Sequence, residues 1–216
     1  FHFGRDMDTS VLFMVMELVD GDHLGRLLDV GRLPPILAYD IMQQACVALD
    51  EAHGLGVIHR DLKPANIMLE PKDCRTQVKL LDFGFARVED DENPRLTGDG
   101  MVGGTLSYAS PEELSGIEVD TRLDIYALGV IFFEMMTGRP PFVGATPQMT
   151  AIMHLTEEPP RVSEFVEVDE ILDELIEWML KKDPDHRPQT VMEVRFEVVQ
   201  AFSLQIGMRE YLARKA

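Results

Sequence analysis

The sequence predicts one α+β domain that is mainly α-helical and has a few short strands near its amino end. Apolar stripes with a repeat of three to four residues recur through most of the chain. Short apolar runs between polar turns occur only before residue 82. With 216 residues, of which 45% are hydrophobic and 27% charged, the chain is long enough to bury a substantial core.

The strands are expected at three short apolar runs. Residues 11–18 form an apolar run bounded by polar residues, which predicts a buried strand that pairs with residues 1–4. Segments 67–69 and 78–81 are strand-like and joined by a polar turn. The polar, acidic and glycine-containing stretch 85–105 is expected to be a mobile loop.

The helices follow from apolar periodicity and from proline and glycine at their ends. They are expected over residues 34–54, 122–137, 171–180 and 190–211. Pro34 and Pro35 suit the first turn of a long amphipathic helix that ends near Gly54. Residues 122–137 are apolar almost all round, which predicts a helix buried on most faces.

The charge and cysteine content exclude several classes of protein. A formal net charge of −18 argues against binding to nucleic acid or to an anionic membrane surface. Cys46 and Cys74 are far apart, so neither a disulfide framework nor a zinc site is expected. No signal peptide and no run of ~20 apolar residues is visible. We expect a cytoplasmic segment, cut from a longer chain, that makes no membrane contact.

Two ordered motifs indicate phosphoryl-transfer chemistry. The first is His59-Arg60-Asp61-Leu62-Lys63-Pro64-Ala65-Asn66, and Asp82-Phe83-Gly84 follows it after the predicted strand pair. Phosphoryl transfer needs an acceptor for a hydroxyl proton and oxygen ligands for magnesium, which Asp61, Asn66 and Asp82 can supply. An isolated Asp-Phe-Gly is more often a turn, but the order and spacing of the whole set are those of protein kinases.

On these motifs the chain resembles the eukaryotic-type serine/threonine protein kinases over residues 11–200, and most of all their bacterial members. The resemblance implies a protein-kinase-like fold. Residues 1–19 would be the last small-lobe strands and the hinge, and residues 20–216 the large carboxy-terminal lobe. It also implies that Asp61 orients the substrate hydroxyl and accepts its proton. Lys63, which favours the serine/threonine branch, would contact the transferring phosphate, while Asn66 and Asp82 would hold Mg²⁺.

The resemblance extends to the segment that recognises the protein substrate. Residues 104–112 would form the substrate-recognition loop, with Thr105 hydrogen-bonded toward the catalytic aspartate and lysine. Leu106 departs from the proline that is common there. Arg187 would pair with Glu112, although a solvated surface arginine is the alternative. Asp124 would hold the catalytic loop through main-chain N–H groups, unless it is only an acid at a helix N-terminus.

Further roles concern nucleotide binding and regulation. Glu17 and Val19 lie in the hinge, whose main chain would meet adenine, and Met68 would pack beneath that base. Asp22 would reach the ribose, or else cap the helix before Leu24. His59 would stack under Phe83, followed by Gly84. Arg60 would receive a regulatory phosphate on Thr97, the only serine or threonine in residues 85–104.

The expected activity is transfer of the ATP γ-phosphate to Ser or Thr hydroxyls of protein substrates, with Mg²⁺ as the second cofactor. Neither a glycine-rich phosphate loop nor a Val-Ala-Ile-Lys-like segment occurs in the sequence. Both are expected in a small lobe upstream in the parent chain, so this chain alone should be inactive. The alternatives are a pseudokinase or scaffold module and, less favoured, a small-molecule phosphotransferase.

Overall fold

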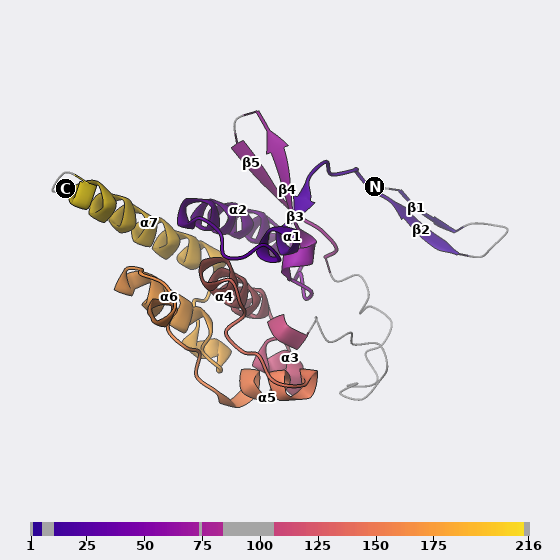
Figure 1. Ribbon diagram of the computed structural model, residues 1–216. Helices are drawn as coiled ribbons and strands as arrows, with labels where there is room; N and C mark the ends of the chain where they lie inside the picture. The colour runs from indigo at the N-terminus through magenta and orange to yellow at the C-terminus, as the bar shows by residue number, and fades with distance from the viewer. Residues whose placement is uncertain (1, 6–10, 74, 84–105, 214–216) are drawn as a thin grey trace.

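The computed structural model describes residues 2–5, 11–73, 75–83 and 106–213, without the side chains at 2, 3, 12, 14 and 205–213. Its helices are α1 (Leu24–Leu28), α2 (Pro35–Gly54), α3 (Pro111–Ser115), α4 (Arg122–Thr137), α5 (Pro147–Thr156), α6 (Glu170–Met179) and α7 (Val191–Ala213). Its strands are β1 (His2–Arg5), β2 (Leu12–Val15), β3 (Asp22–His23), β4 (Ile67–Lys72) and β5 (Arg75–Leu80). Figure 1 shows a helical body with the strands at its amino-terminal side.

Helix α4 forms the centre of the helical body. Its residues from Leu123 to Met136 are all buried, because α2 and α6 pack against it. A helix that is apolar all round is stable in water only when neighbours cover every face. At Gly129 the backbone of α4 lies so close to α6 that an added Cβ would be 2.9 Å from the Cβ of Met179. The helix ends at Gly138, which adopts a left-handed conformation at φ 82°.

The strand predicted over residues 11–18 pairs as expected but is not buried. Strands β1 and β2 form an antiparallel hairpin in which Gly4 lies opposite Phe13. The hairpin stands away from the helical body (Figure 1), so Phe13, Val15 and the flanking Val11 are exposed. The prediction of burial was therefore wrong for these side chains. An apolar run of this length shows that a strand can form, but not that another layer covers it.

Strands β3, β4 and β5 form a second antiparallel sheet that leads into the site. In its centre Met68 pairs with His23 on one side and Lys79 on the other. The side chain of Gln44 on α2 occupies the outer edge of β5. Its amide nitrogen donates to the Thr76 carbonyl over 2.9 Å, and its oxygen accepts from the Val78 N–H over 3.0 Å. Gln44 thus pairs with the strand as a neighbouring main chain would.

Most of the predicted helices are confirmed, with ends that differ by a few residues. Residues 122–137 match α4, and α2, α6 and α7 lie where periodicity indicated. Helix α5 was not predicted, because its apolar residues are largely exposed and form no clear inward stripe: Met149, Ile152 and Leu155. The expected loop 85–105 lies outside the described residues. Within the described part of the chain, no helix is long and apolar enough to cross a membrane.

Candidate active site

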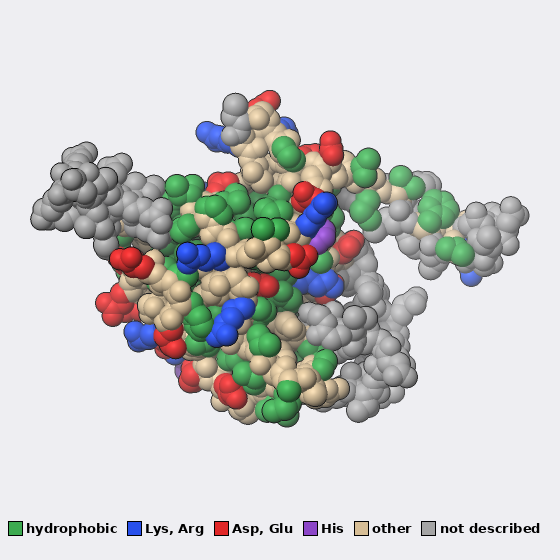
Figure 2. All heavy atoms as spheres, viewed as in Figure 1, with side chains coloured by type: hydrophobic (Ala, Val, Ile, Leu, Met, Phe, Trp, Pro, Cys, Tyr) green, Lys and Arg blue, Asp and Glu red, His purple; other side chains and the backbone are tan. Residues whose placement is uncertain are grey.

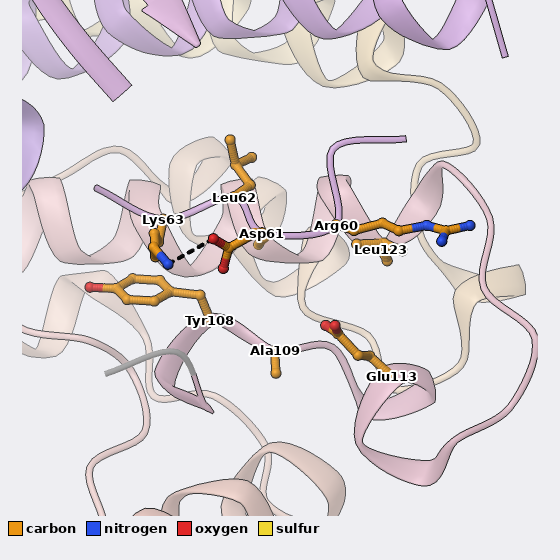
Figure 3. Close-up of a pocket in the computed structure, with 9 residues that line it drawn as sticks. Arg60, Asp61, Leu62, Lys63, Tyr108, Ala109, Glu113 and Leu123 are labelled. Atoms are coloured by element: carbon orange, nitrogen blue, oxygen red, sulfur yellow. Dashed lines mark hydrogen bonds and ion pairs between the residues drawn. The ribbon is translucent and has the colours of Figure 1, made fainter. Parts of the chain in front are cut away.

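The loop between α2 and β4 brings two of the predicted side chains, Lys63 and Asn66, to the carboxylate of a third, Asp61. Lys63 Nζ donates to Asp61 Oδ2 over 2.7 Å, and Asn66 Nδ2 lies 3.0 Å from the same oxygen. Asn66 Nδ2 also donates to the main-chain carbonyl of Asp61 over 2.8 Å. Asn66 is fixed by the short 3-10 helix Pro64–Asn66. These contacts hold the Asp61 carboxylate in one orientation. Figure 3 shows the contact with Lys63.

A buried carboxylate beneath the loop fixes its backbone. Asp124, in the first turn of α4, is fully buried and accepts from the main-chain N–H groups of His59 over 2.9 Å and Arg60 over 3.1 Å. His53 Nε2, at the end of α2, lies 2.8 Å from Asp124 Oδ2. Sequence reasoning had overlooked His53, although its place in the last turn before the catalytic loop was a signal. With these donors the Asp124 charge is satisfied inside the protein.

The backbone at two of the predicted site residues is in the left-handed region. Arg60 has φ 64° and Asp82 has φ 56°, values that non-glycine residues rarely adopt. Such conformations persist only where surrounding contacts hold them, and they concentrate at functional sites. At Arg60 the main-chain conformation is held by the hydrogen bond from its N–H to Asp124, as described above. Next to Asp82, the main chain of Leu81 is held in place, because its N–H donates to the Asn66 carbonyl over 2.8 Å.

His59 supports the Asp82 segment from below. Its ring lies 4.6 Å from the ring of Phe83, centroid to centroid. Burial lowers the pKa of His59, although the nearby Asp124 carboxylate opposes the shift. The imidazole is therefore neutral near pH 7 and serves as a packing surface. Gly84, the last residue of this motif, lies outside the described residues.

A pocket opens beside Asp61, and three parts of the chain line it: loop 60–63, segment 108–113 and helix α4. The residues are Arg60, Asp61, Leu62, Lys63, Tyr108, Ala109, Glu113, Leu123 and Ala127. In Figure 3 the Tyr108 ring lies below Lys63, and Glu113 lies across the pocket from the catalytic loop. Sequence reasoning had placed Tyr108 and Ala109 in the predicted recognition loop without a role of their own, and had not named Glu113. A side chain that enters the pocket between loop 60–63 and segment 108–113 could therefore contact the Asp61 carboxylate.

The segment opposite the catalytic loop is fixed by a buried ion pair. Arg187 Nη1 and Nη2 donate to the two carboxylate oxygens of Glu112, each over 2.7 Å, and both side chains are almost fully buried. Arg187 also donates from Nε to the Lys181 carbonyl over 2.6 Å, and its guanidinium lies 4.8 Å from the ring centroid of Tyr126. Paired charges with their remaining donors satisfied can be buried. In this structure Arg187 is not a solvated surface arginine.

Comparison with known proteins agrees with this geometry. The model of the protein kinase domain matches residues 4–197, which is most of the chain. The chain belongs to the protein kinase family. It is 40% identical over 193 residues to a probable serine/threonine-protein kinase of Streptomyces coelicolor, and 40% identical over 190 residues to the serine/threonine-protein kinase PknB of Mycolicibacterium smegmatis. A serine/threonine-protein kinase of Myxococcus xanthus is 41% identical over 208 residues.

These matches cover most of this chain but a small part of the relatives. They span 88%, 87% and 91% of the chain, and only 28%, 30% and 37% of the three proteins. Among solved structures, the kinase domain of Mycobacterium tuberculosis PknI superposes with a TM-score of 0.70 at 26% identity. That match covers 92% of this chain and 69% of the other. The fold is thus the protein kinase fold, mainly helical with a few strands.

The oxygen atoms of Asn66 and Asp82 fit the way protein kinases use magnesium. Because Asn66 donates from Nδ2 to Asp61, its amide oxygen is turned away from that carboxylate. Asp82 is exposed, and the Leu81 hydrogen bond brings its main chain next to Asn66. Among the described residues no group of three or more His, Cys, Asp or Glu could enclose a metal. Mg²⁺ commonly takes one or two protein oxygens and completes its shell with phosphate and water, and a pair of oxygen-bearing side chains is compatible with that pattern.

The residues predicted to contact adenine and ribose lie after β2, in β3 and in β4. Glu17 forms an ion pair with Lys79 over 2.6 Å, which ties the segment after β2 to β5 and lowers the pKa of Glu17. Val19 follows it and is half-buried. Met68 is half-buried in the central strand β4.

The structure corrects one alternative for the residue predicted to reach the ribose. Asp22 does not cap the helix before Leu24. His23 does so, accepting from the Arg26 N–H over 3.2 Å at Nδ1. Asp22 instead accepts a 2.7 Å hydrogen bond from the Arg26 guanidinium. Thr97 and Thr105, the predicted phosphosite and the predicted recognition-loop threonine, lie outside the described residues.

Proposed function

We propose that this chain is the larger lobe of a serine/threonine protein kinase, which transfers the ATP γ-phosphate to Ser or Thr hydroxyls of protein substrates. The observation that supports this most is the Asp61 carboxylate, held by Lys63 and Asn66 at the wall of a pocket. Such an arrangement suits phosphoryl transfer, in which the protein mainly positions groups and neutralises charge.

The proposed roles follow from the contacts of each side chain. Asp61 accepts a hydrogen bond from the acceptor hydroxyl and takes its proton as the oxygen attacks the γ-phosphorus. Lys63, already at the Asp61 carboxylate, offsets negative charge on the transferring group. Asn66 and Asp82 would provide the protein oxygens for Mg²⁺, which would neutralise the phosphate charge of ATP, the phosphoryl donor. The new oxygen–phosphorus bond replaces the bond to the β-phosphate oxygen, and ADP leaves.

We propose the same division of the chain as the sequence suggested. Residues 1–19 provide the last small-lobe strands and the hinge, and residues 20–216 the carboxy-terminal lobe. The missing glycine-rich loop and ATP-anchoring lysine are supplied by an upstream amino-terminal lobe, which packs on the exposed β1–β2 side. In this arrangement Glu17, Val19, Asp22 and Met68 meet the nucleotide, and Thr105 meets Asp61. We also propose that this domain works in the cytoplasm.

The test is Asp61→Asn in the parent kinase that includes the upstream lobe. Loss of the proton acceptor at nearly constant volume is expected to lower phosphoryl transfer to a protein acceptor by at least ~10²-fold. Nucleotide affinity and thermal unfolding should stay near the wild-type values. Asp50→Asn, on the exposed side of α2, is the matched control and should leave transfer unchanged.

Two outcomes would contradict the proposal in different ways. Near-normal transfer by Asp61→Asn would remove this residue from the mechanism. A wild-type parent that binds nucleotide without transferring phosphate to any protein acceptor would instead favour the pseudokinase alternative. Transfer to a small-molecule alcohol in place of a protein would favour a small-molecule phosphotransferase.

A further inference from the structure

A lysine of β5 joins the connection between β2 and β3 to the three-stranded sheet. The ammonium of Lys79 lies 2.6 Å from Glu17 Oε1 and 3.0 Å from Glu70 Oε2. Glu17 belongs to the connection 16–21, whereas Glu70 and Lys79 lie on the neighbouring strands β4 and β5. One ammonium group therefore links the connection to both strands.

This contact lies on the face of the sheet that carries Met68. Met68 is directly opposite Lys79 in the antiparallel pair, and directly opposite residues have their side chains on the same face. Glu70 follows Met68 by two residues and shares that face. The alternate residues of β4 are buried on the other face. Glu17 is thus joined to the same face as Met68.

The connection 16–21 is attached to the sheet near both of its ends. At Gly21 its main chain lies so close to β4 that an added Cβ would collide with the Leu69 carbonyl oxygen. At Glu17 the attachment is the ion pair with Lys79. Leu18, between these two points, is exposed, so burial in the core does not hold this part in place. Without the ion pair, the amino-terminal end of the connection could move relative to the sheet.

The three side chains stabilise one another in their charged forms. The Lys79 hydrogen bond lowers the pKa of Glu17, and Glu17 followed by Glu70 raises the pKa of Lys79. An exposed ion pair adds little to the stability of a whole protein. Here the pair acts on a short connection, for which a small difference in free energy is enough to favour one position.

We propose that Lys79 is a positioning residue for the nucleotide: it fixes the connection 16–21 beside Met68, so that the two sides of the adenine site keep a constant spacing. This inference rests on the proposed kinase function, in which the connection and Met68 meet the base. Lys79 acts through Glu17 and Glu70 and not by contact with ATP. Its loss should weaken binding of the base and leave the chemical step nearly unaffected.

The binding test uses adenosine, which carries the base and the ribose without phosphate charge. In the parent kinase, Lys79→Met should raise the dissociation constant of adenosine and KM for ATP about threefold, as expected for an exposed ion pair. The value of kcat should stay within about twofold, and KM for the protein acceptor should not change. Lys79→Arg keeps the charge and should restore the wild-type values.

The matched control is Lys72→Met, at a lysine of the same sheet. Its ammonium donates to Gln77 Oε1 over 3.1 Å and makes no ion pair with Glu17 among the described residues. Loss of this charge should leave adenosine binding near the wild-type value. Calorimetry of the variants with adenosine measures this difference, and thermal unfolding checks that each variant is folded.

A second variant and added salt separate the ion pair from the folding of the sheet. Glu17→Gln, at an exposed side chain, should give the same loss as Lys79→Met, and the double variant should lose no more. Raising NaCl from about 0.05 M to about 0.5 M should weaken adenosine binding in the wild type. The same change should have little effect on Lys79→Met, because the ligand is uncharged and the ion pair is already absent.

The ion pair can also be measured without activity. The pKa of the Glu17 carboxyl, followed by carbon-13 NMR in the parent kinase, should lie below its ordinary value in the wild type. In Lys79→Met this pKa should rise toward the ordinary value, because the main hydrogen-bond donor is lost. In Lys72→Met it should stay low.

The outcomes separate this inference from the proposed function. An active wild type whose folded Lys79→Met and Glu17→Gln variants bind adenosine as tightly as wild type would overturn the positioning role. A wild type that binds adenosine but transfers no phosphate would remove the kinase proposal, while weaker binding by both variants would still support the role of Lys79. Weaker binding that Lys79→Arg does not restore would overturn the assignment to the ion pair.

Discussion

At the scale of single residues, the buried charge of Arg187 is matched by several partners. Arg187 is only 1% exposed, yet its guanidinium meets the Glu112 carboxylate in a two-pronged contact and donates to three main-chain carbonyls besides. Removing one member of such a pair leaves the other charge buried and uncompensated, which costs far more than losing an exposed ion pair. The recognition segment therefore depends on this pair for its place.

Glu112→Ala is expected to destabilise the folded chain strongly. The free energy of unfolding should fall by about 3–5 kcal/mol, because the Arg187 charge would remain in the interior without its carboxylate. Urea denaturation followed by circular dichroism measures this change. Glu118→Ala is the control at an exposed acid of the same region and should stay within about 0.5 kcal/mol of wild type. An equally small effect of Glu112→Ala would mean that water reaches the guanidinium.

The residue types of the site could be predicted from the sequence, but their backbone conformations could not. Asp61, Asn66 and Asp82 stand in motifs whose order indicates their chemistry. The left-handed φ angles at Arg60 and Asp82 have no local signal, because glycine or asparagine would be the expected residue there. They are imposed by contacts from distant segments, such as those of Asp124. The pocket residue Glu113 was missed for the same reason, because a distant segment brings it to the pocket.

At the scale of elements, close packing between α4 and α6 depends on a residue without a side chain. Gly129 lies inside α4, where glycine weakens a helix relative to alanine. An added Cβ would be 2.9 Å from Met179 Cβ and 3.1 Å from Leu180 Cδ2. Separations this short would force the two helices apart or distort side chains. Close approach of the helices therefore outweighs the helix propensity lost at this position.

Gly129→Ala is expected to lower the free energy of unfolding by about 1–3 kcal/mol, in spite of the better helix propensity of alanine. The matched control is Gly54→Ala in the last turn of α2, where an added Cβ meets nothing within 4 Å. This substitution should be neutral or stabilising by up to about 1 kcal/mol. Thermal and urea unfolding of both variants distinguish the two cases. Stabilisation by both would show that α4 and α6 adjust to the added methyl group.

Helices that pack on the core were predictable, whereas elements defined by long-range contacts were not. The proline start of α2 and the apolar run of α4 are local signals, and both helices appear within a residue of the expected bounds. Helix α5 buries only Thr150 and His154, so its stripe is too thin to be recognised from periodicity. The β1–β2 hairpin was predicted, but its exposure depends on what lies beside it in space.

At the scale of the whole molecule, one side of the structure is covered less well than the rest. Figure 2 shows hydrophobic side chains on the outer surface of the β1–β2 hairpin, where Val11, Phe13 and Val15 are exposed. Leu18, in the following segment, is 90% exposed. Exposed apolar groups gathered in one region mark an interaction surface. The proposed upstream lobe is the partner that we expect there.

The 216-residue chain alone is therefore expected to bind Mg-ATP weakly and to transfer no phosphate. Contacts from one side of the nucleotide leave too little to offset the association and ordering costs, so calorimetry should show no saturation below about 1 mM. A radiolabelled transfer assay should give no product. The parent kinase domain with its upstream lobe is the positive control. Micromolar binding together with transfer by the isolated chain would show that the upstream lobe is dispensable.

The contact of Gln44 with β5 has a consequence for how copies of the protein behave in a crowded cell. An uncovered outer strand offers a row of free main-chain groups, onto which a second molecule can add its own strand and begin a fibril. Here the Thr76 carbonyl and the Val78 N–H are already occupied by a side chain of the same molecule. At the middle of the β5 edge, the side-chain amide of Gln44 therefore blocks the addition of a further strand to the three-stranded sheet.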